Sequence, residues 1–281
     1  MKVQKNLAFG LIRTKLNVLS AISRRRSGEE AFRLFCTPLM RYKGKEAEVF
    51  LKGEKLQFNL NGLQVKGYRC NGPQTKKVLL LHGFSSTCHK FDKYALSLIE
   101  KGYEVLAFDA PAHGSSEGNT VNAVDYSNMI KKVAELYGPI DAFVSHSFGG
   151  IAVSLALEEI SHGPETKVVL IAPATETSTA IDGAFAMLGI TSNRIRESME
   201  EVIFKISGKK ADWFSVRRAL KNIQASVLWV HDEDDLITPL ADAIKAKEDQ
   251  LPHVQFHITK GLGHQKIYRD AGVKAKILQF L

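Results

Sequence analysis

The strongest constraint on the fold is a series of short apolar runs that alternate with helical patterns. The runs are Val78–Leu81, Val105–Asp109, Ala142–His146, Val168–Ile171, Val227–Val230 and Val254–Thr259. Short, continuous apolar runs of this kind are typical of buried parallel strands. Their alternation with helices predicts an α/β fold, with a mostly parallel sheet of about eight strands and helices on both faces. In such a sheet, functional residues lie in loops at the carboxyl ends of the strands.

Two segments depart from this alternation. Residues 176–222 contain no strand-like run and are predicted to form a helical cap inserted into the sheet domain. Residues 1–45 precede the first strand and are predicted to form a basic helical N-terminal extension. The sheet domain therefore comprises residues 46–175 and 223–281.

The first part of the sheet domain predicts an antiparallel strand pair, Glu46–Leu51 and Leu56–Tyr68. The turn dipeptide Asn61-Gly62 lies either inside the second run or between two shorter strands. A helix over about residues 265–280 is expected to end the domain.

The positive charge is concentrated at the N-terminus. Of a net charge of +8, residues 1–50 carry +7, from eleven Lys or Arg and four Glu. The remaining chain is nearly neutral, which argues against a nucleic-acid-binding protein.

One helical face of the N-terminal segment is apolar, and it consists of Leu7, Leu11, Val18, Leu19 and Ile22. The segment is too short and too charged to span a membrane. Contact with a membrane surface is one interpretation, but packing against the domain or a second subunit is preferred, because most amphipathic helices pack onto a core.

Composition also limits the cofactors and the compartment. The three cysteines, Cys36, Cys70 and Cys88, are widely separated and odd in number, which favours a reducing compartment and a cytoplasmic location. His82, His113 and His146 lie near strand ends but lack metal-ligand spacing, so no metal is expected. The Gly261-x-Gly263 pair lacks the third glycine of a dinucleotide fingerprint, so no nicotinamide or flavin cofactor is expected.

The segment Ser145-His146-Ser147-Phe148-Gly149 joins a predicted strand to a predicted helix. A sharp strand-to-helix turn lifts the oxygen of its central serine clear of the sheet. The neighbours two positions away must then be small, which is the reason behind the G-x-S-x-G nucleophile elbow. Ser145 occupies the place of the first glycine. Ser147 could alternatively be a simple helix N-cap.

Three further loops follow predicted strands and carry the residues that would activate such a serine. They are His82-Gly83-Phe84, the acidic loop from Asp232 to Asp235, and Gly261-Leu262-Gly263-His264. The order Ser, Asp, His is the one used on this type of fold. A neutral imidazole removes the serine proton, and a carboxylate orients the imidazole.

The chain resembles the α/β-hydrolase fold family over roughly residues 46–281, and the Asp109-Ala-Pro-Ala-His-Gly loop resembles bacterial members of it. This resemblance implies that Ser147 is the nucleophile, His264 the general base and Asp235 the acid. It also implies that the backbone N–H groups of Phe84 and Phe148 form the oxyanion hole. The family usually has glycine at position 232, so Asp232 and Asp234 remain alternative acids, in a loop otherwise expected to be solvated.

The resemblance implies a serine hydrolase that cleaves an ester or thioester through an acyl-enzyme intermediate. Ser147 excludes the branches with an aspartate nucleophile, such as dehalogenases and epoxide hydrolases. Peptidase, carbon–carbon bond hydrolase and cofactor-free haloperoxidase chemistry remain alternatives on the same triad, as does a non-catalytic member that binds a ligand beneath the cap. The apolar residues of segment 176–222 favour a small-molecule substrate with an apolar acyl or aryl group, although residues that only pack the helices together would give the same pattern.

Overall fold

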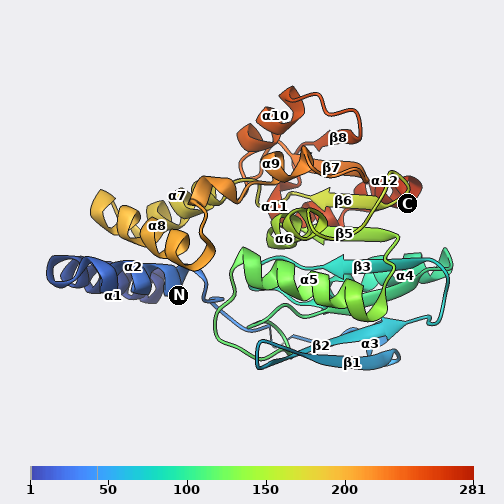
Figure 1. Ribbon diagram of the computed structural model, residues 1–281, viewed down its shortest axis with the longest axis horizontal. Coiled ribbons are helices and arrows are strands. Elements are labelled where there is room, and N and C mark those ends of the chain that lie inside the picture. Colours follow the sequence, from blue (N-terminus) through green and yellow to red (C-terminus); the bar gives the residue numbers. More distant parts are fainter. Residues whose placement is uncertain (1, 43) are drawn as a thin grey trace. The chain divides into compact units, whose positions relative to one another are not determined.

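A computed structural model describes residues 2–42 and 44–281, with side chains described from residue 8 onward. Its sheet has eight strands in the order β1-β2-β4-β3-β5-β6-β7-β8 (Figure 1). The strands are β1 Glu54–Leu60, β2 Leu63–Cys70, β3 Lys77–Leu81, β4 Glu104–Phe108, β5 Ala142–His146, β6 Lys167–Ile171, β7 Ser226–Asp232 and β8 Val254–Thr259. β2 pairs antiparallel with β1 and β4, and all other pairs are parallel. The predicted mostly parallel sheet is confirmed.

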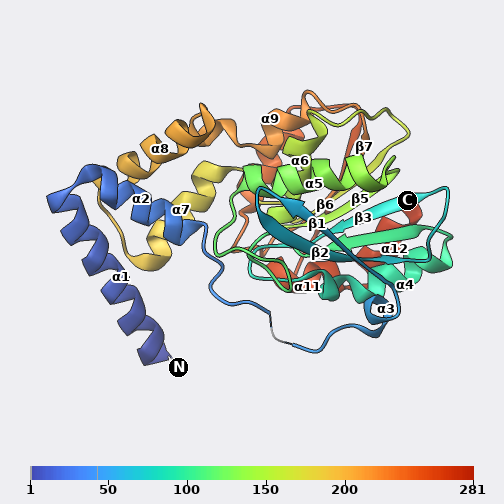
Figure 2. The same ribbon diagram turned by 60° about the horizontal axis from the view of Figure 1, so that its bottom comes forward.

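Helices cover both faces of this sheet. They are α3 Glu48–Leu51, α4 Asp92–Glu100, α5 Ala123–Tyr137, α6 Phe148–Leu157, α9 Val216–Leu220, α10 Leu240–Glu248, α11 Gly263–Lys266 and α12 Ala271–Phe280. Helices α5, α6 and α9 lie on one face, and α3, α4, α11 and α12 lie on the other (Figure 2). The central strands are therefore buried from both sides, which explains why their sequences are continuous apolar runs rather than alternating ones.

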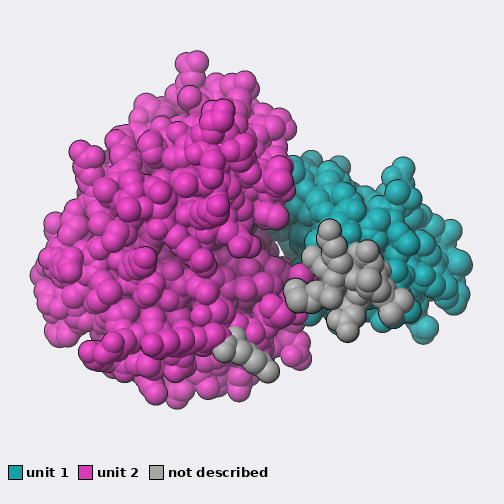
Figure 3. Space-filling view, turned by 180° about the vertical axis from the view of Figure 1, so that it is seen from behind, with its two compact units in different colours: residues 1–37, 176–215 teal, residues 38–175, 216–281 magenta. Residues whose placement is uncertain are grey.

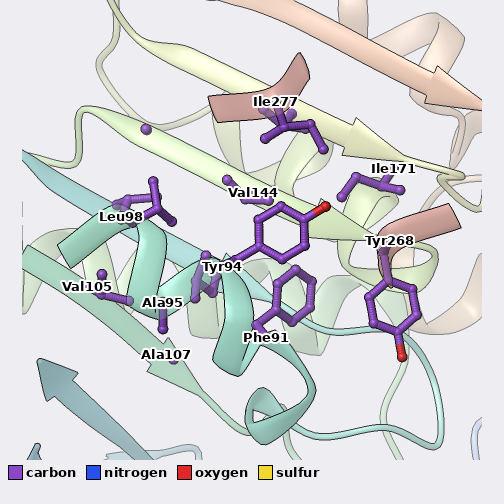
Figure 4. Close-up of a cluster of buried hydrophobic side chains, with 14 of the residues drawn as sticks. Phe91, Tyr94, Ala95, Leu98, Val105, Ala107, Val144, Ile171, Tyr268 and Ile277 are labelled. Carbon is purple, nitrogen blue, oxygen red and sulfur yellow. The ribbon is translucent and has the colours of Figure 1, made fainter. Parts of the chain in front are cut away.

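The main hydrophobic cluster lies between α4, α12 and the sheet (Figure 4). Phe91, Tyr94 and Leu98 pack there with Val105 of β4 and Val144 of β5, and all five are almost fully buried. Burial of one such side chain contributes about 1.5–3 kcal/mol. The cluster supports the strands from which the site loops emerge.

The predicted strand Glu46–Leu51 is wrong, because residues 48–51 form the single helical turn α3. The edge of β2 is occupied instead by β1, which reaches it through the tight turn at Asn61 and Gly62. Both turn residues have a positive φ, of +51° and +84°, as a two-residue hairpin requires. The turn therefore lies between two shorter strands, which was one of the two predicted arrangements.

The chain divides into two compact units, coloured separately in Figure 3. Residues 38–175 and 216–281 form the core unit, which contains the sheet. Residues 1–37 and 176–215 form the helical unit, with helices α1 Lys2–Ile22, α2 Arg24–Phe35, α7 Thr177–Leu188 and α8 Asn193–Ser207. The N-terminal helices and most of the inserted segment, distant in sequence, thus belong to one unit.

Within the helical unit, α2 packs against α8. Small buried residues of α2, Ser27, Gly28 and Ala31, allow a close approach, and a Cβ on Gly28 would lie 2.2 Å from the main-chain oxygen of Ser198. Arg24 also forms ion pairs with two exposed glutamates of α8, Glu197 and Glu201, which add a small electrostatic contribution to the contact.

The buried face of α1 differs from the predicted one. Leu11, Val18 and Ile22 are exposed, by 65%, 53% and 72%, whereas Leu16 and Ser20 are buried. Leu19 is half-buried, and the side chain of Leu7 lies outside the described residues. The reason is that Ser23 caps a new helix, α2, which packs on the Leu16 side of α1. Among the described residues, no helix is long and apolar enough to cross a membrane.

Candidate active site

Ser147 lies at the sharp turn between β5 and α6. Its backbone has φ +54° and ψ −116°, a strained conformation for a residue other than glycine. The turn is held because the Ser147 amide donates to the Ile171 oxygen at 3.0 Å, while its own oxygen accepts from Gly150 and Ala174. A Cβ on Gly149 would lie 2.6 Å from the Leu81 oxygen, which accounts for the glycine at that position.

Ser145 takes the place of the first glycine in the elbow pattern. Its side chain is fully buried and its hydroxyl donates to the main-chain oxygen of Val169 at 2.9 Å. The substitution is therefore accommodated, because the added hydroxyl has a hydrogen-bond partner in β6.

His264 connects the serine with a carboxylate. Its Nε2 lies 2.9 Å from Ser147 Oγ, and its Nδ1 lies 2.8 Å from Asp235 Oδ2. The three residues come from loops at the carboxyl ends of β5, β7 and β8, where the parallel topology places functional loops. The structure thus brings together the three side chains that the sequence singled out.

Asp235 is buried, and both oxygens of its carboxylate accept hydrogen bonds. Its Oδ1 accepts the amides of Ile237 and Thr238 at 2.8 and 2.9 Å, and its Oδ2 accepts the Thr238 hydroxyl at 2.8 Å. Burial opposes ionisation, but the hydrogen bond and charge of His264, together with these amides, outweigh it and lower the pKa of the Asp235 carboxyl. An ionised carboxylate can orient the imidazole and stabilise its protonated form.

The two other candidate acids do not contact His264 through their carboxylates. Asp234 is exposed, and its Oδ2 accepts the amide of Gly261 at 2.9 Å. Asp232 is fully buried and accepts the main-chain amides of Leu262 and Gly263, in the loop that follows β8. The expectation of a solvated acidic loop is therefore wrong for Asp232, because β7 continues to this residue and places its side chain inside the protein.

Phe84 and Phe148 lie next to each other beside the serine. Their rings meet edge to face at 5.5 Å, and a Cβ on Gly83 would lie 3.1 Å from Ser147 Cβ. Within residues 2–42 and 44–281, no protein acceptor takes the amide hydrogens of Phe84 or Phe148. Two unengaged N–H groups beside a nucleophile are the donors that an oxyanion hole needs.

Two buried histidines hold the Phe84 loop. His82 Nδ1 donates to the Gly83 oxygen at 2.8 Å, and His113 Nε2 accepts the Ser85 amide at 2.9 Å. Burial, together with the nearby His82, lowers the pKa of His113 to about 3, and burial also lowers the pKa of His82. Both rings are therefore neutral, with each nitrogen serving a fixed main-chain partner.

The site also contains residues to which the sequence analysis gave no role there. Thr238 Oγ1 lies 2.8 Å from Asp235 Oδ2 and 3.2 Å from His264 Nδ1. His146 Nε2 lies 3.0 Å from the main-chain oxygen of His264. Their positions beside Pro239 and Ser147 were the available signals. Among the described residues, no group of three or more His, Cys, Asp or Glu side chains is arranged to hold a metal ion.

Comparison with known proteins identifies the family of this chain. A sequence-family model described as "Alpha/beta hydrolase family" matches residues 78–271. The uncharacterized hydrolase YugF of Bacillus subtilis is 30% identical over 122 residues, which cover 41% of this chain and only 43% of that protein. The putative esterase/lipase 2 of Mycoplasma pneumoniae is 22% identical over 224 residues, 68% of this chain and 82% of its own length.

Several solved structures have a similar fold. The esterase Pf2001 of Pyrococcus furiosus has a TM-score of 0.66 at 17% identity, covering 88% of this chain and 97% of its own. Est1E of Butyrivibrio proteoclasticus, solved with ferulic acid bound, has a TM-score of 0.60 at 18% identity, covering 80% and 97%. At these identities the likeness shows the fold.

Proposed function

Because this chain belongs to the alpha/beta hydrolase family, we propose that it is a serine hydrolase that cleaves carboxylic esters or thioesters through an acyl-enzyme intermediate. The observation that carries the proposal is the continuous hydrogen-bonded path from Ser147 Oγ through His264 to Asp235. The esterase names of relatives and structural neighbours are consistent with it.

In the proposed reaction, Ser147 Oγ attacks the carbonyl carbon of the substrate while His264 Nε2 accepts the hydroxyl proton. The negative charge that develops on the carbonyl oxygen is stabilised by the N–H groups of Phe84 and Phe148. The carbon–oxygen or carbon–sulfur bond then breaks, and His264 returns the proton to the leaving alcohol or thiol. Water, deprotonated by His264, attacks the acyl-enzyme, and collapse of the second tetrahedral intermediate releases the acid and protonates Ser147.

We propose that the substrate is a small molecule with an apolar acyl or aryl group. Leu236 and Ile237, which directly follow Asp235, are exposed by 91% and 66%. The half-buried rings of Phe84 and Phe148 contribute further apolar surface beside the serine. Apolar side chains such as the Phe148 ring, directly after Ser147, favour an ester whose acyl part leaves water on binding.

The experiment that tests the proposed function is labelling with a fluorophosphonate probe, followed by assays with nitrophenyl esters of increasing acyl length. Wild-type protein should react with the probe and hydrolyse the esters, and kcat/KM should rise with acyl length. Ser147→Ala should abolish both activities, whereas Ser115→Ala, in the nearby Asp109–Ser115 loop, should preserve labelling. Labelling that persists in Ser147→Ala would contradict the assignment of the nucleophile. An unreactive wild-type protein would favour a non-catalytic binding member.

The assignment of the acid has its own pair of variants. Asp235→Asn keeps the shape of the side chain but stabilises the wrong imidazole tautomer, so kcat should fall by about 10⁴-fold. Asp234→Asn should reduce kcat by less than about tenfold, because the carboxylate of Asp234 accepts the Gly261 amide and, among the described residues, has no hydrogen bond with His264. The reverse order of effects would identify Asp234 as the acid.

The roles of the other segments also remain proposals. We propose that residues 176–222 act as a cap that influences substrate choice, and that α1 serves packing rather than a membrane surface. Co-sedimentation with anionic vesicles at low and high salt tests the second point, because binding through exposed charges is screened by salt. Salt-sensitive pelleting that is lost in a Leu11→Ser, Val18→Ser, Ile22→Ser variant would instead support membrane contact.

A further inference from the structure

Asp232 is a buried carboxylate that the proposed reaction does not use. It is the last residue of β7, and it pairs with Thr259 at the end of β8. Its side chain is fully buried, and none of the ion pairs among the described residues involves it. A buried charge without a cation must be stabilised by hydrogen bonds alone.

Four donors surround this carboxylate. Oδ1 accepts the amides of Gly263 and Asp234 at 2.8 and 3.0 Å, and Oδ2 accepts the Thr259 hydroxyl and the Leu262 amide at 2.7 and 3.1 Å. Burial alone would raise the pKa of Asp232, but these hydrogen bonds outweigh it and lower the pKa below its ordinary value. The carboxylate is therefore ionised, and its hydrogen bonds are charge-assisted.

The loop before His264 has a backbone shaped to bind anions. Gly261, Leu262 and Gly263 have φ values of +85°, −94° and +58°. This alternation turns successive amides toward the same side, as in the backbone nests that bind anions. Here all three amides donate to carboxylates of the acid loop, that of Gly261 to Asp234 and the other two to Asp232.

We propose that Asp232 is a positioning residue that holds the main chain in front of His264, and so sets the distance from the imidazole to Ser147. This inference rests on the proposed serine-hydrolase function. Gly263 directly precedes His264, so its bond to Asp232 fixes the backbone one residue from the imidazole. Asp235, on the same loop, binds the ring itself. One short loop thereby fixes both the backbone and the ring orientation of His264.

The chemistry of the site requires a carboxylate rather than an amide. In Asp232→Asn, one oxygen becomes an NH₂ group that faces two donors, either Gly263 and Asp234 or Leu262 and Thr259. That group cannot accept from a main-chain amide, so facing Gly263 and Asp234 it loses both bonds, and facing Leu262 and Thr259 it loses the Leu262 bond, while the Thr259 hydroxyl can turn and accept from it. At least one main-chain bond to the acid is therefore lost although the volume is unchanged. The Gly261–Gly263 loop should then shift, and with it His264 Nε2.

The test compares Asp232→Asn with Glu233→Gln, a neighbouring charge-removing variant. Glu233 is exposed, and its side chain pairs with Lys260 rather than with the loop amides. We expect Asp232→Asn to lower kcat by about 10- to 100-fold with KM changed less than about threefold, because small displacements of a catalytic group cost this much. Glu233→Gln should stay within about twofold of wild type. Equal losses in both variants would indicate an effect of loop charge and overturn the proposal.

A spectroscopic readout separates positioning from loss of structure. The proton between His264 Nδ1 and Asp235 should give a downfield ¹H NMR resonance in the wild-type protein, which moves or broadens in Asp232→Asn while the thermal midpoint shows a folded protein. A folded Asp232→Asn protein with wild-type kcat and an unchanged resonance would overturn the proposal. If the wild-type protein shows neither esterase activity nor probe labelling, the proposed function fails. The resonance still tests whether Asp232 positions His264.

Thr259→Val provides a second variant in case Asp232→Asn does not fold. It keeps the shape of the side chain and removes one donor to Asp232 Oδ2. We expect a two- to fivefold lower kcat and a shifted downfield resonance. Wild-type values for both in Thr259→Val would overturn the proposal if Asp232→Asn is unfolded.

Discussion

His146 Nε2 lies 3.0 Å from the main-chain oxygen of His264 and donates a hydrogen bond to it. The direct neighbour of Ser147 in sequence thus binds the main chain of the histidine that contacts the Ser147 hydroxyl. The two imidazole rings also lie 4.8 Å apart. Burial, together with the nearby His264, lowers the pKa of His146 to about 3, so the His146 ring is neutral. Its hydrogen bond therefore supports the main chain of His264, in addition to the bond that Asp235 makes with the ring.

His146→Phe should therefore lower kcat about three- to tenfold, with a smaller change in KM. Phenylalanine preserves a ring that can pack against Tyr268, whose ring lies 4.5 Å from that of His146, but it removes the bond to the His264 oxygen. Steady-state assays with a nitrophenyl ester measure the effect. His257→Phe, on the edge strand β8, provides the control and should retain wild-type kcat. Wild-type kcat in His146→Phe would show that the bond has no role in positioning His264.

Stability of the core unit should fall as pH drops from about 6.5 toward 3. His113 and His146 both have a pKa of about 3 in the folded protein, caused mainly by burial, against about 6.5 in an unfolded chain. In this window the unfolded chain binds more protons than the native one, so acidification favours unfolding. Each histidine contributes at most about 1.4 kcal/mol per pH unit.

The midpoint of guanidinium-induced unfolding, determined at several pH values between 7 and 5, measures this dependence. Most carboxylates remain ionised in this range and so contribute little to it. Trp213→Phe leaves Trp229, buried in β7, as the only tryptophan and thus as a fluorescence probe of the core unit. A further His113→Gln substitution should lower the midpoint at pH 7 but flatten its pH dependence. A constant midpoint between pH 7 and 5 in the parent protein would contradict the prediction.

The sheet was predictable because its parallel strands are buried on both faces. Each residue of Val78–Leu81 lies inside, so the apolar run itself marks the strand. The segment Glu46–Leu51 was mispredicted because a single buried side chain, Phe50, anchors it, and one anchor suits a helical turn as well as a strand. The buried side of α1 depended on where α2 packs, which periodicity within α1 cannot reveal.

The residues proposed to react could be predicted because each follows a strand end in a fixed order. The residues that hold them could not. Asp232 appeared to belong to a solvated acidic loop, since its burial depends on how far β7 extends and on the φ values of Gly261 and Gly263. His146 carried no signal beyond its place beside Ser147, because its partner is a main-chain oxygen more than a hundred residues away.

The close contact between α2 and α8 leaves no room for a side chain at Gly28. Gly28→Ala would place a methyl group 2.2 Å from the main-chain oxygen of Ser198. Backbone cannot move away as a flexible side chain can, so the helices must separate, at a cost of about 1–3 kcal/mol. Amide hydrogen exchange in α2 and α8 should therefore become faster, while exchange in β3, β5 and β6 of the core unit remains unchanged.

Gly10→Ala, on α1, is the matched control, because among the described side chains and the backbone of other elements no atom lies within 4 Å of the Cβ it would add. Alanine is a better helix former than glycine by about 0.5–1 kcal/mol, so this variant should slow exchange in α1 or leave it unchanged. The same glycine-to-alanine change is thus expected to speed amide exchange at Gly28 and to slow it, or leave it unchanged, at Gly10. Fluorophosphonate labelling of Ser147 should persist in both variants, since the core unit contains the whole triad. Unchanged exchange of α8 in Gly28→Ala would show that α2 does not pack there as described, and loss of labelling would show that the site depends on the helical unit.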